Sequence, residues 1–231
     1  MAAGKIVDLR KLLAERFPQE RLPAGDRLVT GLRIFDETLD GGLTKGAITE
    51  LTSAPGNAGS ATIIASLLQR AGRGRYFIAL IDGRDSFDPS ASDGIGGSAL
   101  RHLLWVRCRK ATEAMQAADL LLRDGNFPLV ILDLVLNPVE ELRKIPQTHW
   151  YRLQRLVEPA STAFLVLTAR NMISSAQWKC TLENRWTLSQ LDEETADLQA
   201  QLKIRVQRAQ FDSAVTDRRY RRSDGGIARA G

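Results

Sequence analysis

The chain has 231 residues, of which 44% are hydrophobic and 26% are charged, and its formal net charge is +5. This composition is typical of one large α/β domain or two small domains, and it excludes a wholly disordered chain. The sequence contains no apolar run of membrane-spanning length and no signal-peptide stretch, and two cysteines are too few for a disulfide framework or a four-ligand zinc site. We therefore expect a cytoplasmic protein with no metal and no membrane contact.

An amphipathic helix is predicted for residues 5–17, because Ile6, Leu9, Leu13 and Phe17 recur at three- and four-residue spacing. Pro18 ends this helix, and a polar segment containing proline and glycine follows as a linker to residue 27. A helix this short is seldom stable alone in water. We expect its apolar stripe to dock on its own core, on a second copy of the chain or on another protein.

Residues 28–210 are predicted to form an α/β core with a mostly parallel sheet flanked by helices. Short, continuous apolar runs are typical of strands buried on both faces, and helical patterns alternate with them. The predicted strands are 47–51, 76–81, 103–106, 129–132, 163–167 and 202–206, and the predicted helices are 34–39, 60–71, 111–123 and 150–157.

The loop between the first of these strands and its helix has the spacing of a phosphate-binding loop, G-x-x-x-x-G-K-[ST]. Gly56 and Gly59 permit the turn, and a helix N-terminus after such a turn can also bind an anion. However, Ser60 occupies the lysine position and Ala61 occupies the position of the metal-binding hydroxyl. The two side chains that hold phosphate and Mg²⁺ are therefore missing.

All of the net charge lies at the C-terminal end, where eight basic and three acidic residues follow Leu202. Within the predicted tail, residues 211–231, Arg218, Arg219, Arg221 and Arg222 flank Tyr220. This pattern suits single-stranded DNA, with arginines on phosphates and a base stacked on the tyrosine. A contact with a partner protein and a solvated arm remain equally open interpretations.

The order of these segments resembles the ATPase core of RecA-family recombinases over residues 30–191. The segments that carry the resemblance are VTGLRIFDETLDGGLTKGAITEL, FIALIDGRDSFDP, PLVILDL and AFLVLTARNM. The resemblance implies that Asp133 is the acid of the Walker B strand, as either a structural group or a ligand of a Mg²⁺–nucleotide. It also implies that Arg84 replaces the catalytic glutamate and Ala169 replaces the glutamine that senses the γ-phosphate.

With Ser60 and Ala61, these replacements imply a degenerate ATPase that is not an enzyme and needs no cofactor. The resemblance further implies that the second DNA-binding loop is shortened to about residues 171–176.

Within the RecA-like superfamily, the chain looks most like the ImuA group of accessory proteins in mutagenic translesion synthesis. The segments LRKLLAERFP and LRHLLWVRCRKATEAMQAADLLLRDGNFPLVILDL carry this resemblance. It implies an adaptor in DNA-damage tolerance and the SOS response that binds an ImuB-like protein and RecA, with self-association through the N-terminal helix. A SulA-like inhibitor of cell division and a nucleotide-binding RecA paralogue are the alternatives.

Overall fold

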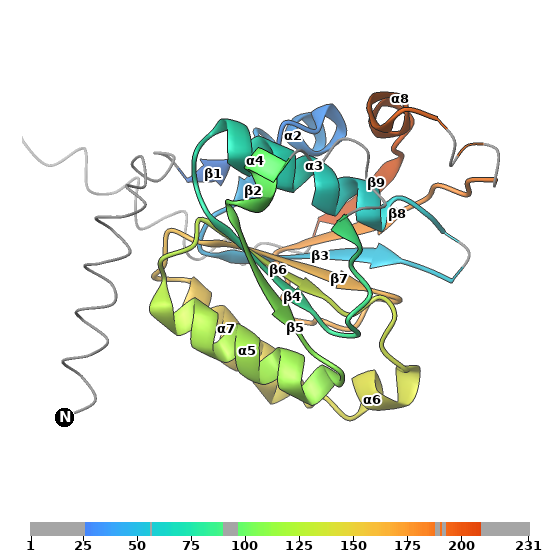
Figure 1. Cartoon of the computed structure of the whole chain (residues 1–231). Coiled ribbons are helices and arrows are strands. Elements are labelled where there is room, and N and C mark those ends of the chain that lie inside the picture. The colour runs from blue at the N-terminus through green and yellow to red at the C-terminus, as the bar shows by residue number, and fades with distance from the viewer. Residues whose placement is uncertain (1–25, 56, 90–96, 188–189, 191–192, 209–231) are drawn as a thin grey trace, which may run out of the picture.

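A computed structural model describes residues 26–55, 57–89, 97–187, 190 and 193–208. A seven-stranded sheet forms its centre, in the order β5-β4-β6-β7-β3-β8-β9 (Figure 1). Its neighbouring strands pair in parallel except β8 and β9, which pair antiparallel. The strands are β3 (Ala47–Ser53), β4 (Ile78–Asp82), β5 (Leu103–Arg107), β6 (Leu129–Asp133), β7 (Ala163–Thr168), β8 (Trp178–Leu182) and β9 (Ile204–Arg208). A short antiparallel ribbon of β1 (Arg27–Leu28) and β2 (Leu43–Thr44) precedes β3.

Helices cover both faces of this sheet (Figure 1). On one face lie α2 (Arg33–Thr38), α3 (Ser60–Arg73), α4 (Gly97–Leu100) and α8 (Thr195–Ala200). On the other face lie α5 (Ala111–Asp124), α6 (Val139–Arg143) and α7 (Gln147–Val157). The predicted class, an α/β fold with a mostly parallel sheet flanked by helices, is confirmed.

Each central strand contributes side chains to two hydrophobic cores, because successive side chains point to opposite faces of a sheet. Leu80 and Ile131 belong to the core under α3, whereas Ile81 and Leu132 belong to the core under α5 and α7. Burial on both faces explains why these strands read as continuous apolar runs.

Two features differ from the sequence-based expectations. The strand predicted at 103–106 is present as β5, but it is not buried on both faces, and Leu104 is 39% exposed. The reason is its position at the edge of the sheet, where β4 is its only neighbour among the described strands. The sequence did not predict β8, whose buried residues alternate with half-exposed Lys179 and Thr181. Its position between β3 and β9 makes it a strand.

The two ends of the chain that were singled out from the sequence lie outside the described residues. This applies to the predicted helix with Ile6, Leu9, Leu13 and Phe17, and to the tail with Arg218, Arg219, Tyr220, Arg221 and Arg222.

Candidate functional site

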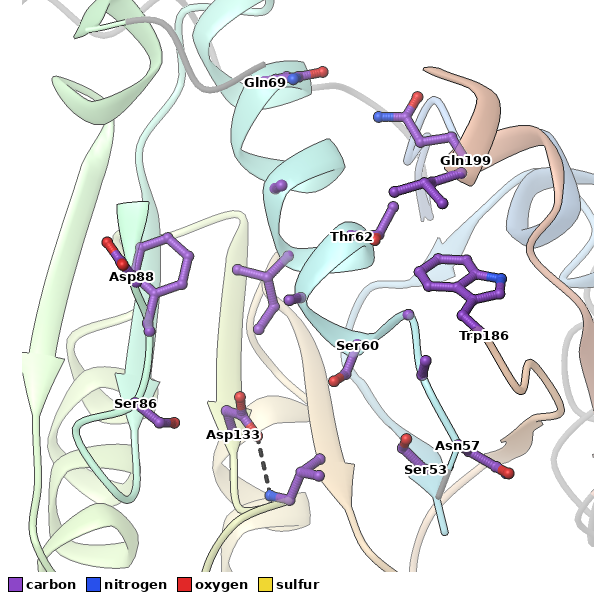
Figure 2. Close-up of a pocket in the computed structure, with 18 of the residues that line it drawn as sticks. Ser53, Asn57, Ser60, Thr62, Gln69, Ser86, Asp88, Asp133, Trp186 and Gln199 are labelled. Atoms are coloured by element: carbon purple, nitrogen blue, oxygen red, sulfur yellow. Dashed lines mark hydrogen bonds between the residues drawn. The ribbon is translucent and has the colours of Figure 1, made fainter. Parts of the chain in front are cut away.

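A groove of about 1550 Å³ opens where the carboxyl ends of β3, β4, β6 and β7 meet the N-terminus of α3. Open parallel sheets bind their ligands at this edge. Figure 2 shows Ser53 and Ser60 on one side of the groove, Ser86 and Asp88 on the other, and Asp133 between them. The structure thus brings together five residues singled out from the sequence, which are Gly59, Ser60, Ala61, Asp133 and Ala169. Gly56 lies outside the described residues.

The loop before α3 is held by the C-terminal strands of the sheet. Within it, the backbone N–H of Asn57 donates to Ala54 O at 2.9 Å, and the N–H of Ala58 donates to Asn184 O at 2.9 Å. The Asn57 side chain also donates from Nδ2 to Leu182 O at 2.6 Å. A phosphate-binding loop needs free N–H groups that point at the ligand. In this loop, two of those donors are committed to the protein itself.

Gly59 caps α3 in a left-handed conformation with φ of 107°. A Cβ atom at this position would lie 2.9 Å from Leu202 Cδ2 and 3.5 Å from Trp186 Cη2. Both residues belong to the chain that follows β8, and Figure 2 shows Trp186 beside the start of α3. Gly59 is therefore required both by the backbone turn and by the close approach of this segment.

The start of α3 offers no cation to the groove. Ser60 is half-buried and Ala61 is exposed, as the first two residues of the helix. Among the described residues that line the groove, the only basic one is Arg73, while Asp88, Asp133, Glu193 and Glu194 are acidic. A phosphate group in this groove would face repulsion rather than the attraction that phosphoryl-transfer sites provide.

Asp133 ends β6 and is half-buried in the floor of the groove. Its Oδ1 accepts a hydrogen bond from the Val135 N–H at 3.0 Å. Loss of solvation raises the pKa of Asp133 to about 6, against the opposing effect of that hydrogen bond, and the charge of Asp82 adds to the rise. Asp82 is the register partner of Asp133 on β4.

The Arg84 side chain does not line the groove, although the resemblance to RecA-family recombinases places it in the degenerate site. The carboxylate of Asp82 accepts hydrogen bonds from the N–H groups of Arg84, Ser86 and Phe87. This tight turn directs the exposed Arg84 side chain toward α5, where its guanidinium donates to Arg109 O at 2.8 Å. The cation that replaces the expected glutamate therefore contacts the neighbouring loop instead of the groove.

The loop after β7 is short and is fixed to the middle of the sheet. Glu50 on β3 is fully buried, and its Oε1 accepts hydrogen bonds from the N–H groups of Met172 at 2.7 Å and Ile173 at 3.2 Å. Thr52 also donates to Asn171 Oδ1 at 2.8 Å. The segment predicted as a shortened DNA-binding loop thus packs against its own sheet.

Several lining residues were not found from the sequence, namely Ser86, Glu193 and Glu194. Trp186 also lines the groove and belongs to no motif in the sequence. The segment 186–199 reaches the groove because β8 and β9 carry it there, and no local sequence pattern signals that path. Asp88 lies in the Asp-Pro pair that contributed to the resemblance, so a signal for it was present.

Two further properties concern the ranges of the chain that the structure describes. None of the described helices is long and apolar enough to span a bilayer. Within the same ranges, no group of three or more His, Cys, Asp or Glu side chains is arranged to hold a metal ion.

Comparison with known proteins relates the chain to RecA. It is 30% identical to Protein RecA of Methylococcus capsulatus over 139 residues, of Leifsonia xyli subsp. xyli over 122 residues and of Rubrobacter xylanophilus over 107 residues. These alignments cover 58%, 52% and 46% of the chain, but 40%, 32% and 30% of the respective RecA proteins. The chain thus matches less than half the length of these relatives. No protein-family model matches it. The partial homology, together with the fold, supports a place in the RecA-like superfamily.

Proposed function

We propose that the protein is a non-catalytic, RecA-like adaptor in DNA-damage tolerance. It binds an ImuB-like protein and RecA and so supports error-prone translesion synthesis. The observation that carries this proposal is the loop before α3, whose Asn57 and Ala58 N–H groups bind the protein instead of a phosphate. The partial homology to RecA proteins supports the DNA-damage context.

The chemistry of the groove argues against phosphoryl transfer. Efficient transfer needs a cation on the phosphate oxygens, a metal ligand and a group that orients the nucleophile. Ser60 and Ala61 supply neither of the first two, and Arg84 lies outside the groove. Three contributions are therefore weakened at once, and each is worth several kcal/mol of barrier in enzymes that have it.

The adaptor role is assigned to the two ends of the chain. The apolar stripe of residues 5–17 provides a docking helix, for a second copy or for RecA. The arginine-rich tail provides contacts with the ImuB-like protein or with single-stranded DNA.

Calorimetry with Mg²⁺–ATP and an assay of phosphate release test the non-catalytic part of the proposal. We expect no affinity tighter than high micromolar and no release above a blank. Turnover that disappears in Asp133→Ala would show instead that the groove is an active ATPase site, since Asp133 lies in its floor.

Co-purification with the ImuB-like protein and with RecA tests the adaptor part. The complexes are expected to form equally with and without nucleotide, because the groove does not bind one. Capture of a cytoskeletal division protein, with no capture of either expected partner, would support the SulA-like alternative.

A further inference from the structure

The groove is acidic where a nucleotide-binding relative would be basic. Asp133 lies in its floor and Glu194, which is exposed, lies on its rim at the N-terminus of α8. Arg73 is the only basic residue among the described residues that line it. Its electrostatics therefore favour a cationic ligand.

Two side chains in the wall offer the other contacts that an arginine-rich peptide needs. Ser53 is only 3% exposed, lines the groove and has no hydrogen-bond partner for its hydroxyl among the described residues. The hydroxyl is therefore free to bond a ligand in the groove. Trp186 is partly exposed and lies beside the start of α3 (Figure 2), and indole faces attract guanidinium groups.

A cationic segment lies within reach on the same chain. Residues 1–202 carry no net charge, whereas segment 211–231 contains five arginines and three aspartates, a net charge of +2, with four of the arginines clustered at 218–222. The chain leaves β9 at Arg208, which pairs with Trp178 at the far end of β8 from the groove. A return along β9 takes about 17 Å, and crossing β8 and β3 takes about 10 Å. The ten residues from Arg208 to Arg218 can span about 33 Å.

We infer that the groove is a binding site for a guanidinium-bearing peptide, and that the chain's own segment 211–231 occupies it. The arginines of the segment face Asp133 and Glu194, one of them stacks on Trp186, and the backbone of the segment bonds the Ser53 hydroxyl. The groove that holds a nucleotide in ATPases thus holds the basic tail here. This contact competes with the contacts to DNA or to the ImuB-like protein that are proposed above for the same tail.

Competition with a labelled peptide of residues 211–231 tests the inference on the full chain. The tail-neutral variant carries alanine at Arg218, Arg219, Arg221 and Arg222. It is expected to bind the peptide at least tenfold more tightly than the wild type, because an attached tail competes at millimolar effective concentration. Binding to the tail-neutral variant should also weaken at least fivefold between 50 mM and 300 mM salt, since it depends on ion pairs.

Groove variants locate the site on the molecule. In the tail-neutral background, Asp133→Asn combined with Glu194→Gln should weaken peptide binding at least fivefold. Trp186→Phe should also weaken peptide binding, and it should remove the change in tryptophan fluorescence that peptide binding causes in the tail-neutral variant. Glu140→Gln is the matched control, since Glu140 is an exposed acid on α6, away from the groove. Equal affinity of the wild type and the tail-neutral variant for the peptide would overturn the inference. So would equal losses from the groove pair and the control.

Discussion

Asp133 lies at the end of β6 in an environment that disfavours its charge. Its pKa of about 6 lies above the ordinary value of 3.8, so the folded protein binds a proton here that the unfolded chain has already released between these pH values. The charge of Asp133 therefore costs stability that is fully felt above pH 6 and disappears as the pH falls through the ordinary carboxyl range.

In the variant with alanine at Arg218, Arg219, Arg221 and Arg222, where no tail arginine faces the carboxylate, Asp133→Asn is accordingly expected to stabilise the fold at pH 8. The gain should be roughly 1–3 kcal/mol, because two pKa units correspond to about 3 kcal/mol and the side chain keeps some solvent contact. The gain should vanish near pH 4. Urea unfolding at both pH values measures it, and Glu140→Gln should change stability at neither. A loss of stability at pH 8 would mean that a cation, rather than burial, governs the carboxylate.

Glu50 is a buried acid with a structural task. Burial raises its pKa, while the N–H groups of Met172 and Ile173 and the charge of Lys179 oppose this rise. Glu50→Ala is expected to cost about 2–4 kcal/mol, because it leaves the buried Ile173 N–H and the partly buried Met172 N–H without an acceptor and opens a cavity.

Glu50→Gln separates the hydrogen bonds from the charge, because the amide oxygen can still accept both N–H groups. It should cost less than about 1 kcal/mol. Its stability should also decline less than that of the wild type as the pH rises through the carboxyl range, since the raised pKa makes the charged form the costly one. Hydrogen exchange at Met172 and Ile173 should be fast in the alanine variant and slow in the glutamine variant. Slow exchange in both would contradict this role.

At the scale of elements, the junction between the loop and α3 depends on a glycine. Gly59→Ala is expected to cost about 1–3 kcal/mol, because an L-residue is strained at φ of 107° and the added methyl would lie 2.9 Å from Leu202 Cδ2. Gly125→Ala measures the backbone strain without a steric contact, since Gly125 also has a positive φ but has open space around it. It should cost about 1 kcal/mol.

Gly97→Ala completes this series, because Gly97 has neither a positive φ nor a neighbour within 4 Å among the described residues, and it should be nearly neutral. Thermal unfolding of the three variants gives the comparison. Equal costs at Gly59 and Gly125 would show that the contact with Leu202 has no effect on the loop.

At the scale of the whole molecule, the described residues form a complete seven-stranded sheet without the N-terminal segment. Deletion of residues 1–20 is therefore expected to leave the core folded, with a cooperative thermal unfolding transition like that of the full chain. It should weaken self-association or binding to RecA, because the apolar stripe of the predicted helix needs a partner surface. Unchanged sedimentation of the deletion variant together with its unchanged affinity for RecA would contradict the docking role of the predicted helix.

The central strands and the long helices could be predicted from the sequence for simple reasons. The runs at 129–132 and 163–167 are apolar throughout because both faces of β6 and β7 are buried. The helices α3 and α5 show their apolar stripes directly, and Gly125 marks the end of α5. β8 and α8 have no such local signal, since they are fixed by contacts with segments far away in the chain.

For the groove, the sequence by itself determined which side chains stand at the start of α3 and after β7, because the identities of Ser60, Ala61 and Ala169 do not depend on the fold. Only the tertiary structure decided where the other groups point. The turn around Asp82 directs Arg84 away from the groove. The pairing of β8 and β9 brings Asn184 against the Ala58 N–H and Glu194 to the rim. The physical reason is that residue types are local properties, whereas the direction of a side chain and the partner of a backbone N–H are set by strands that meet across more than one hundred residues of chain.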